Sequence, residues 1–405
     1  NGEIDLTIEQ EQIALELAKN KNADSTFIQQ SGINLGYYFE RKEDLAAAIE
    51  HYKIAINYNA YQRKTITAYQ KIGYCYLLLD DYYNSIAYYD LVIELILKHK
   101  GSTSKLRDVY LNAATAALRL GKKESILQAE YYALKADSLS AIAKKRIGTE
   151  YRIKLCLAEL NNRHENLHPE KAFLYYNQAI EIAKEINDST LISTAYFGRG
   201  NVFSASNPEK AINYLEEALH ITSTTDTINR YLIVIDMGTT YARMGQFKKS
   251  IALKHEALRY LFGSSLDNHK KLNASILQDS DYLKNQFTGI TTLAESYLQD
   301  FETSGDTISL EKSLSYFKLA DAATDFLKIN SRDFRSRLFW RELSAGLYGK
   351  AIRASYLAKN IDLAYYYIEK NKALLLLEDT NNQQFKKSLQ LTPSILRKEK
   401  LLKNQ

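Results

Sequence analysis

The chain has 405 residues, and 45% of them are apolar, which is enough for a large buried core. Three prolines and 16 glycines are few for this length, so the composition favours a mostly helical chain. The net charge of +5 is spread along the chain, which argues against a dedicated nucleic-acid surface, and no apolar run approaches the roughly 20 residues that span a bilayer.

The two cysteines, Cys75 and Cys156, are too few for a disulfide framework. Both lie inside helical patterns, so both are expected to be packing residues. The first residue is Asn1, which is not a natural start. A leader or signal segment removed before it therefore stays an open alternative, and the compartment stays open with it.

The first element predicted along the chain is a helix within residues 1–22. Thr7 and Gln10 have the three-residue spacing of a capping box, which predicts that the helix begins at Thr7. The polar residues 20–22 are expected to end it. This segment has no partner helix of its own, so we interpret it as an N-terminal capping or half-repeat helix.

Residues 23–262 contain a short pattern that recurs with a period typical of helical arrays. Its clearest copies begin at Gly36 and Gly73, which are 73 − 36 = 37 residues apart. At matching offsets the two copies contain Gly36, Phe39, Ala48, Tyr52 and Ala55, and Gly73, Tyr76, Ser85, Tyr89 and Val92. The spacing predicts two antiparallel helices that approach closely at small residues. One such pair cannot bury its own apolar faces, so the pairs are expected to stack.

This pattern resembles the tetratricopeptide repeat (TPR) family. A third copy consists of Gly238, Tyr241, Ser250 and Ala257, with Lys254 at the place of the second aromatic residue. A fourth copy has a turn one residue shorter and consists of Gly200, Phe203, Ala211, Leu215 and Ala218. The resemblance implies an all-α fold, namely a right-handed α-α superhelix, or TPR-like solenoid, of about eight helix pairs.

The resemblance also implies a function, because such solenoids present an extended concave surface that binds a protein or peptide. It places this surface on the first helix of each pair, at side chains that follow the marker glycine: Tyr37, Arg41, Tyr74, Leu78, Asn201, Ala205, Thr239 and Arg243. Tyrosine and arginine are frequent anchors of interfaces. The paired Lys and Asn with which the family binds carboxylates are not evident in adjacent units, which argues against capture of a peptide C-terminus.

Residues 263–380 continue the pattern in lengthened, degenerate form. One predicted pair joins a helix over residues 276–298 to a partner that carries Ser313, Phe317 and Ala320. Another joins a helix over residues 334–359 to a partner over residues 361–378. Residues 381–405 are expected to be a linker and the start of a C-terminal helical segment, which Pro393 opens.

A second resemblance is confined to the C-terminal segment. Residues 369–378 and 391–400 are similar to the junction at which TPRs precede a CHAT domain, a caspase-like cysteine protease module, in bacterial proteins. This similarity implies a non-enzymatic scaffold that binds a partner and regulates or targets a protease domain downstream in the same polypeptide. The TPR sensor region of a signalling kinase is the alternative, and the sequence encoded after Gln405 distinguishes the two.

One string in the chain has the form of a catalytic motif. His164, Glu165 and His168 satisfy the H-E-x-x-H pattern of zinc hydrolases, in which a helix presents both imidazoles on one face. Pro169 disfavours helical geometry at His168, so the string is predicted to lie in a loop between helices. A zinc metallohydrolase is therefore the weaker alternative, and no catalytic residue, metal or cofactor is expected.

Overall fold

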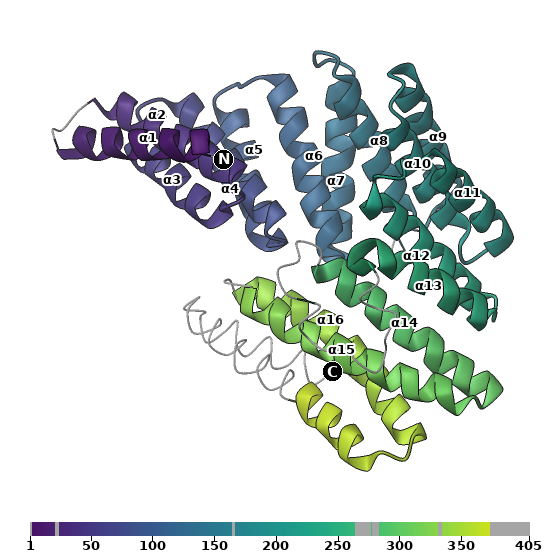
Figure 1. Cartoon of the computed structure of the whole chain (residues 1–405). Helices are drawn as coiled ribbons and strands as arrows, with labels where there is room; N and C mark the ends of the chain where they lie inside the picture. The colour runs from purple at the N-terminus through teal and green to yellow at the C-terminus, as the bar shows by residue number, and fades with distance from the viewer. Residues whose placement is uncertain are drawn as a thin grey trace, which may run out of the picture. The chain divides into compact units, whose positions relative to one another are not determined.

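A computed structural model describes residues 2–20, 24–163, 167–263, 277, 283–330 and 334–372 (Figure 1). Within these ranges the regular elements are all helices, and none of these helices is both long and apolar enough to cross a membrane. Contacts divide the chain into two compact units, Asn1–Ile233 and Val234–Gln405, which we call unit 1 and unit 2 and describe separately. The predicted all-helical fold is confirmed.

Unit 1 contains eleven helices in the part of it that the structure describes, followed by the first residues of a twelfth. They are α1 Gly2–Asn20, α2 Ser25–Arg41, α3 Leu45–Tyr58, α4 Gln62–Leu78, α5 Tyr82–Lys98, α6 Thr103–Leu120, α7 Lys123–Ser140, α8 Ile147–Asn161, α9 Pro169–Glu185, α10 Ser189–Phe203 and α11 Pro208–Ile221. Helix α12, Thr227–Arg243, begins in unit 1 and ends in unit 2. The later described helices are α13 Phe247–Phe262, α14 Leu283–Ser304, α15 Thr307–Asn330, α16 Phe334–Leu357 and a helix over residues 361–372.

The helices of unit 1 stack in chain order, as Figure 1 shows. Each helix from α1 to α10 packs against the next one along the chain. The even-numbered helices also contact one another, since α2 touches α4, α4 touches α6, α6 touches α8 and α8 touches α10. Short turns join α2 to α3 and α4 to α5, so these are antiparallel pairs. The predicted stacking of helix pairs is therefore confirmed.

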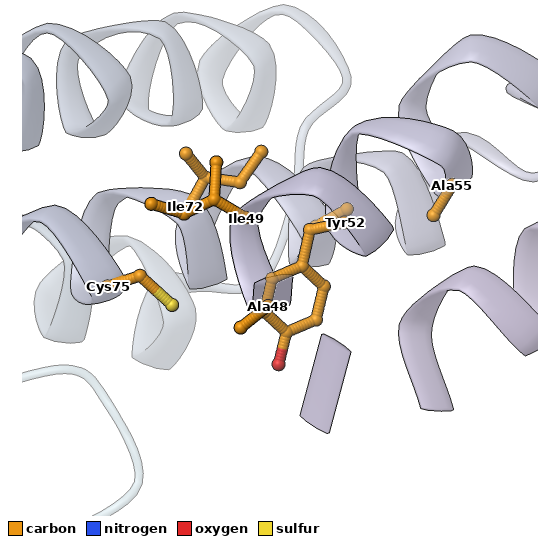
Figure 2. Close-up of a cluster of buried hydrophobic side chains, with 7 residues drawn as sticks. Ala48, Ile49, Tyr52, Ala55, Ile72 and Cys75 are labelled. Atoms are coloured by element: carbon orange, nitrogen blue, oxygen red, sulfur yellow. The ribbon is translucent and has the colours of Figure 1, made fainter. Parts of the chain in front are cut away.

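The marker residues of the repeat pattern form the core of unit 1. Ala48, Tyr52 and Ala55 of α3 are fully buried and belong to one cluster with Ile72 and Cys75 of α4, which Figure 2 shows. Because α2 carries no side chain at Gly36, the ring of Tyr52 can lie against its backbone. A Cβ atom on Gly36 would be 2.5 Å from Cε1 of Tyr52. The small residue therefore sets the distance between the two helices.

The start of the first helix was predicted wrongly. Helix α1 begins at Gly2, so Thr7 lies inside it and does not cap it. Packing explains the longer helix, because Ile8 is buried in a cluster with Leu35 of α2 and Ile4 packs against the same cluster one turn earlier. Tertiary contacts of these residues extend the helix beyond a local capping signal, which contributes only about 1 kcal/mol.

Both cysteine side chains are buried in unit 1, as expected for packing residues. Cys75 is fully buried and Cys156 is 6% exposed. Burial raises the pKa of the Cys75 thiol to about 12, and burial likewise raises the pKa of Cys156 far above its ordinary value. Since the thiolate is the reactive form, neither side chain is poised for chemistry at neutral pH.

We therefore expect both cysteines to resist thiol reagents in the folded protein. Treatment with dithiobis(nitrobenzoate) at pH 8 should release less than about a tenth of the colour that two free thiols give, because access and thiolate formation are both suppressed. In 6 M guanidinium chloride both thiols should react within minutes. Rapid stoichiometric reaction of either cysteine in buffer alone would contradict their buried placement.

Candidate functional site

The unburied side chains of the even-numbered helices form one surface of unit 1, which we call the even-helix face. On α4 this surface consists of Arg63, Thr67, Gln70, Tyr74 and Leu78, spaced three or four residues apart and therefore on one side of the helix. The opposite side of α4 is buried. Hydrogen bonds between three residue pairs join the surface across neighbouring even-numbered helices, namely Lys71 to Glu40, Lys105 to Thr67, and Arg152 to Asn112.

Two exposed tyrosines stand on this face, on adjacent first helices of two pairs. Tyr37 of α2 is 44% exposed and Tyr74 of α4 is 37% exposed. The ammonium group of Lys71 lies 5.8 Å from the centre of each ring, so one cation connects both rings. Cation–π contacts of this kind hold aromatic side chains in place while leaving part of each ring accessible.

Glu40 fixes the position of Lys71. Its carboxylate accepts hydrogen bonds from Lys71 Nζ at 2.9 and 3.1 Å, and from the hydroxyl of Tyr52 at 2.8 Å. Tyr52 is fully buried, and burial followed by the hydrogen bond to Glu40 raises the pKa of its hydroxyl. The core tyrosine of the first repeat is thus linked through Glu40 and Lys71 to the exposed pair above it.

The structure brings together part of the predicted site. Tyr37 and Arg41 are exposed on α2, Tyr74 and Leu78 are exposed on α4, and the two helices are in contact. Asn201 is half-buried on α10. Whether these residues touch a ligand stays a prediction.

The remaining predicted residues lie elsewhere. Ala205 is in the turn after α10, which ends at Phe203, because Asn207 caps α11 through its side chain and Pro208 begins that helix. Its place on a first helix was therefore predicted wrongly. Thr239 and Arg243 are on the part of α12 that belongs to unit 2, and the hydroxyl of Thr239 donates to the carbonyl of Ile235.

A cavity of about 720 Å³ opens beside the even-helix face, and the sequence patterns did not predict it. It is bounded by the first half of α4, the end of α5, the start of α6 and the residue before α8. Three cationic side chains and one carboxylate line it, namely Arg63, Lys105, Arg146 and Asp108. The spacing of Arg63, Thr67, Gln70 and Tyr74 along α4 was the signal in the sequence that could have pointed to it.

Unit 2 contains a buried lysine at an aromatic position of the repeat pattern. Lys254 of α13 is 3% exposed, and its Nζ donates to the carbonyl of Thr292 at 3.0 Å and to the hydroxyl of Ser296 at 2.9 Å. Burial lowers the pKa of Lys254 to about 8. Both acceptors belong to α14, so the side chain joins α13 to α14 within the core and is closed off from solvent.

The zinc-hydrolase string is only partly described. His168 is exposed and lies outside the helices, directly before Pro169, which begins α9, in agreement with the predicted loop at this residue. His164 and Glu165 lie outside the described residues. Within the described ranges, no group of three or more His, Cys, Asp or Glu side chains is arranged to hold a metal ion.

The repeat in the middle of the even-helix face identifies its architecture. The family model of the tetratricopeptide repeat matches residues 66–99, which run from α4 to the end of α5. This segment is similar to one tetratricopeptide repeat. It contains the TPR marker residues Gly73 and Tyr89, and it supplies Tyr74 to the exposed pair. No curated protein matches the sequence.

One solved structure supports the same TPR-like fold, and two others are similar at lower TM-scores. NprR in complex with its cognate peptide NprX is 14% identical, with a TM-score of 0.52 over 84% of this chain and 97% of that one. A Rap protein complexed with competence and sporulation factor is 11% identical, with a TM-score of 0.47 over 85% of this chain and 97% of that one. The apo quorum sensor NprR from B. thuringiensis is 14% identical, with a TM-score of 0.43 over 92% and 95%. At these identities the likeness to the NprR–NprX complex concerns the fold alone.

Proposed function

We propose that unit 1 is a non-enzymatic scaffold that binds a peptide, or an extended segment of another protein, on its even-helix face. The observation that carries this proposal is the pair of exposed rings, Tyr37 and Tyr74, with Lys71 held between them. Large aromatic side chains are usually buried, and those left accessible on a defined surface often anchor a partner. Here the rings are on α2 and α4, which are the first helices of two successive pairs and contact each other.

The surroundings of the pair favour binding, because they are already ordered. Lys71 is fixed by two hydrogen bonds to Glu40, which is itself bonded to the buried Tyr52. A ligand that packs an apolar side chain on the accessible parts of the two rings would therefore order few further side chains, and ordering one side chain at an interface costs about 0.5 to 1.5 kcal/mol. The site is suited to a narrow, extended ligand that crosses α2 and α4.

The fold is consistent with this use. The NprR structure that has a TM-score of 0.52 to this chain was solved in complex with its cognate peptide NprX. A stack of helix pairs gives such a surface its length, since each added pair extends the row of first helices. The fold supplies a row of first helices, and we propose the exposed tyrosines as the part of that row that contacts the ligand.

We further propose that the bound partner is presented to a caspase-like protease of the CHAT type in the same polypeptide. This part of the proposal rests on the similarity of residues 369–378 and 391–400 to a TPR–CHAT junction. The sequence encoded after Gln405 is its test. A CHAT module there would support the proposal, and a kinase domain would replace it with the sensor alternative.

Alanine variants test the binding surface. Peptides of 12 random residues displayed on phage would be selected on the full chain, and one enriched peptide would be synthesised with a fluorophore for anisotropy titration. We expect Tyr37→Ala, Tyr74→Ala and Arg41→Ala each to weaken its affinity, with about a tenfold loss or more for the tyrosines, as is typical of anchor residues. Circular dichroism should show unchanged helix content.

Tyr131→Ala is the matched control, because Tyr131 is 52% exposed on α7 and lies off the even-helix face. Its affinity should stay within about twofold of the native chain, as expected away from an anchor. Equal losses for Tyr131→Ala and Tyr74→Ala would overturn the assignment of the binding surface, and so would native affinity in both tyrosine variants of the even-helix face.

A further inference from the structure

The cavity beside α4 and α6 concentrates positive charge in a small volume. Arg63 of α4, Lys105 of α6 and Arg146, which precedes α8, all line it. Its volume of about 720 Å³ is within the range of roughly 300 to 1,000 Å³ that is usual for ligand sites. The whole chain carries 53 basic and 48 acidic residues, so this local excess is far above the average.

The carboxylate in the cavity is already engaged. Asp108 accepts hydrogen bonds from Nε and Nη2 of Arg107 at 2.9 Å and from Nη1 of Arg146 at 3.0 Å. Arg107 is fully buried and also donates to the carbonyl of Lys144. Asp108 is therefore neutralised by two guanidinium groups and has little attraction left for Arg63 or Lys105.

Arg63 and Lys105 lack an acidic partner within the described chain. Lys105 donates to the neutral hydroxyl of Thr67 at 2.9 Å, and Arg63 takes part in no salt bridge there. Burial, followed by the nearby charge of Arg63, lowers the pKa of Lys105. Two cations that repel one another in a half-buried cavity would both be stabilised by an anion placed between them.

The start of α6 adds to the positive electrostatic potential in the cavity. Gly101, Ser102 and Ser104 line the cavity, and the capping residue Ser102 makes no hydrogen bond from its side chain to the first turn. The amino end of an 18-residue helix carries a partial positive charge and free N–H groups. These groups reinforce the preference for a negatively charged ligand that the three cationic side chains establish.

The cavity lies on the same side of α4 as the exposed tyrosine. Arg63 and Gln70 line the cavity, and Tyr74 follows Gln70 by one turn. From Arg63 to Tyr74 there are 74 − 63 = 11 residues, which is about 16 Å along a helix at about 1.5 Å per residue. An extended peptide covers that length with about five residues at roughly 3.3 Å each.

We propose that the cavity binds side-chain carboxylates of an acidic peptide whose apolar anchor, about five residues away, packs on the accessible parts of the Tyr37 and Tyr74 rings. This inference rests on the proposed function, since it describes the ligand of the same even-helix face. Acidic side chains fit better than a C-terminal carboxylate, because three cations line a cavity large enough for several ligand residues. A bidentate contact from Arg63, which has no acidic partner in the described chain, is the expected mode of recognition.

A charge-reversal pair on neighbouring residues of α4 tests the proposal. Arg63→Glu places a carboxylate in the cavity, whereas Lys64→Glu makes the same change of net charge next to it at a residue that does not line the cavity. Random 12-residue peptides would be selected on the native chain, and the binders sequenced and titrated by anisotropy. We expect enrichment of Asp and Glu at a fixed distance from an aromatic or aliphatic residue.

Arg63→Glu should weaken the affinity of such a peptide by about tenfold or more, and Lys64→Glu by less than about threefold, since only a close pair of charges is strongly coupled. Replacing the peptide's Asp and Glu by Asn and Gln should cause a similar loss on the native chain and little loss on Arg63→Glu. Amidation of the peptide C-terminus should leave the affinity unchanged, and a loss on amidation would overturn the assignment to side chains.

The failures of the two proposals are distinguishable. Binders that lack acidic residues, lose affinity with Tyr74→Ala and are unaffected by Arg63→Glu would overturn the acidic-ligand inference and leave the binding face in place. If the selection yields no binder, or binders that ignore both Tyr74→Ala and Arg63→Glu, the proposed function itself fails.

Discussion

Replacing Gly36 by alanine is expected to lower the free energy of unfolding of unit 1 by about 2 kcal/mol, as overpacking of a core does. The added methyl carbon would stand 2.5 Å from Cε1 of Tyr52. That ring is fully buried, and its hydroxyl is bound to Glu40, so it cannot move aside without losing the hydrogen bond. Urea unfolding followed by circular dichroism measures the change.

Gly73→Ala is the matched control, because Gly73 faces Tyr89 in the next repeat as Gly36 faces Tyr52. Its methyl would be 3.1 Å from the ring. The hydroxyl of Tyr89 is buried without a hydrogen-bond partner in the described chain, so this ring is free to shift by a few tenths of an ångström. Alanine also gains about 1 kcal/mol of helix propensity over glycine, so we expect Gly73→Ala to be near neutral.

The two glycine variants together test the packing of the pairs. Tyr52→Phe in the Gly36→Ala background removes the bond to Glu40 and should recover part of the lost stability, which a double-mutant cycle would show as favourable coupling. Equal free energies of unfolding for Gly36→Ala and Gly73→Ala would contradict the close approach at Gly36.

Lys254→Met is expected to stabilise unit 2 at pH 7 and to remove a pH dependence from its unfolding. The pKa of Lys254 is lowered from 10.5 to about 8 in the folded protein, chiefly by burial. Glu295 and Asp236 favour the charged form, whereas Lys350 and Arg243 oppose it. Below pH 8 the amine is protonated in both states, so the folded protein bears the full cost of burying the charge.

The direction in which the free energy of unfolding changes with pH follows from the number of protons that each state binds. Between pH 8 and 10.5 the unfolded chain retains the proton on Lys254 and the folded chain has released it, so the free energy of unfolding rises with pH. A difference of about 2.5 pKa units corresponds to about 3 kcal/mol at 1.36 kcal/mol per unit. Other lysines and tyrosines titrate in the same range, so the quantity to compare is the difference between variants.

Urea unfolding of the native chain, Lys254→Met and Lys318→Met between pH 7 and 10 measures this difference. Lys318 is exposed on α15 and serves as the control for removal of one positive charge. The stability advantage of Lys254→Met should shrink as the pH rises, and it is compared at each pH with the effect of removing the exposed charge of Lys318. A constant difference for Lys254→Met would show that its amine titrates normally.

The fold could be predicted from the sequence because the pattern is made of local spacings that reflect packing. A glycine followed by an aromatic residue at an offset of 16 predicts a ring against a helix backbone, and Gly36 and Tyr52 meet in that way. In the copy with the shorter turn, Gly200 likewise faces a large side chain, that of Leu215, and a Cβ atom on the glycine would be 2.9 Å from Cγ of the leucine. These contacts depend on one repeat and its turn.

The candidate site was predicted less completely, since it depends on how successive pairs are rotated against one another. Tyr37 and Tyr74 were identified from their place after the marker glycine. Their link through Lys71 was not, because the position of the ammonium group is set by Glu40 of the preceding helix pair. Arg146 likewise reaches Asp108 from a turn 38 residues away, which no motif indicates.

The contact of Lys254 with α14 could not be predicted from the repeat pattern for a different reason. A lysine at the aromatic position looks like a degenerate repeat when α12 and α13 are considered alone. The polar partners of its amine, Thr292 and Ser296, come from α14, beyond a segment in which the pattern changes register. The substitution is therefore matched by a change in the neighbouring helix, which the sequence shows only once that neighbour is known.

Several hydrogen-bonded partners of unit 1 that lie in different helix pairs have similar separations in sequence. Lys105 and Thr67 are 38 residues apart, Arg107 and Lys144 are 37 apart, and Arg152 and Asn112 are 40 apart. Each of these separations thus corresponds to about one repeat of the chain. Each helix pair therefore depends mainly on the pair before it and the pair after it, so a change in one pair is expected to disturb its two neighbours more than distant pairs.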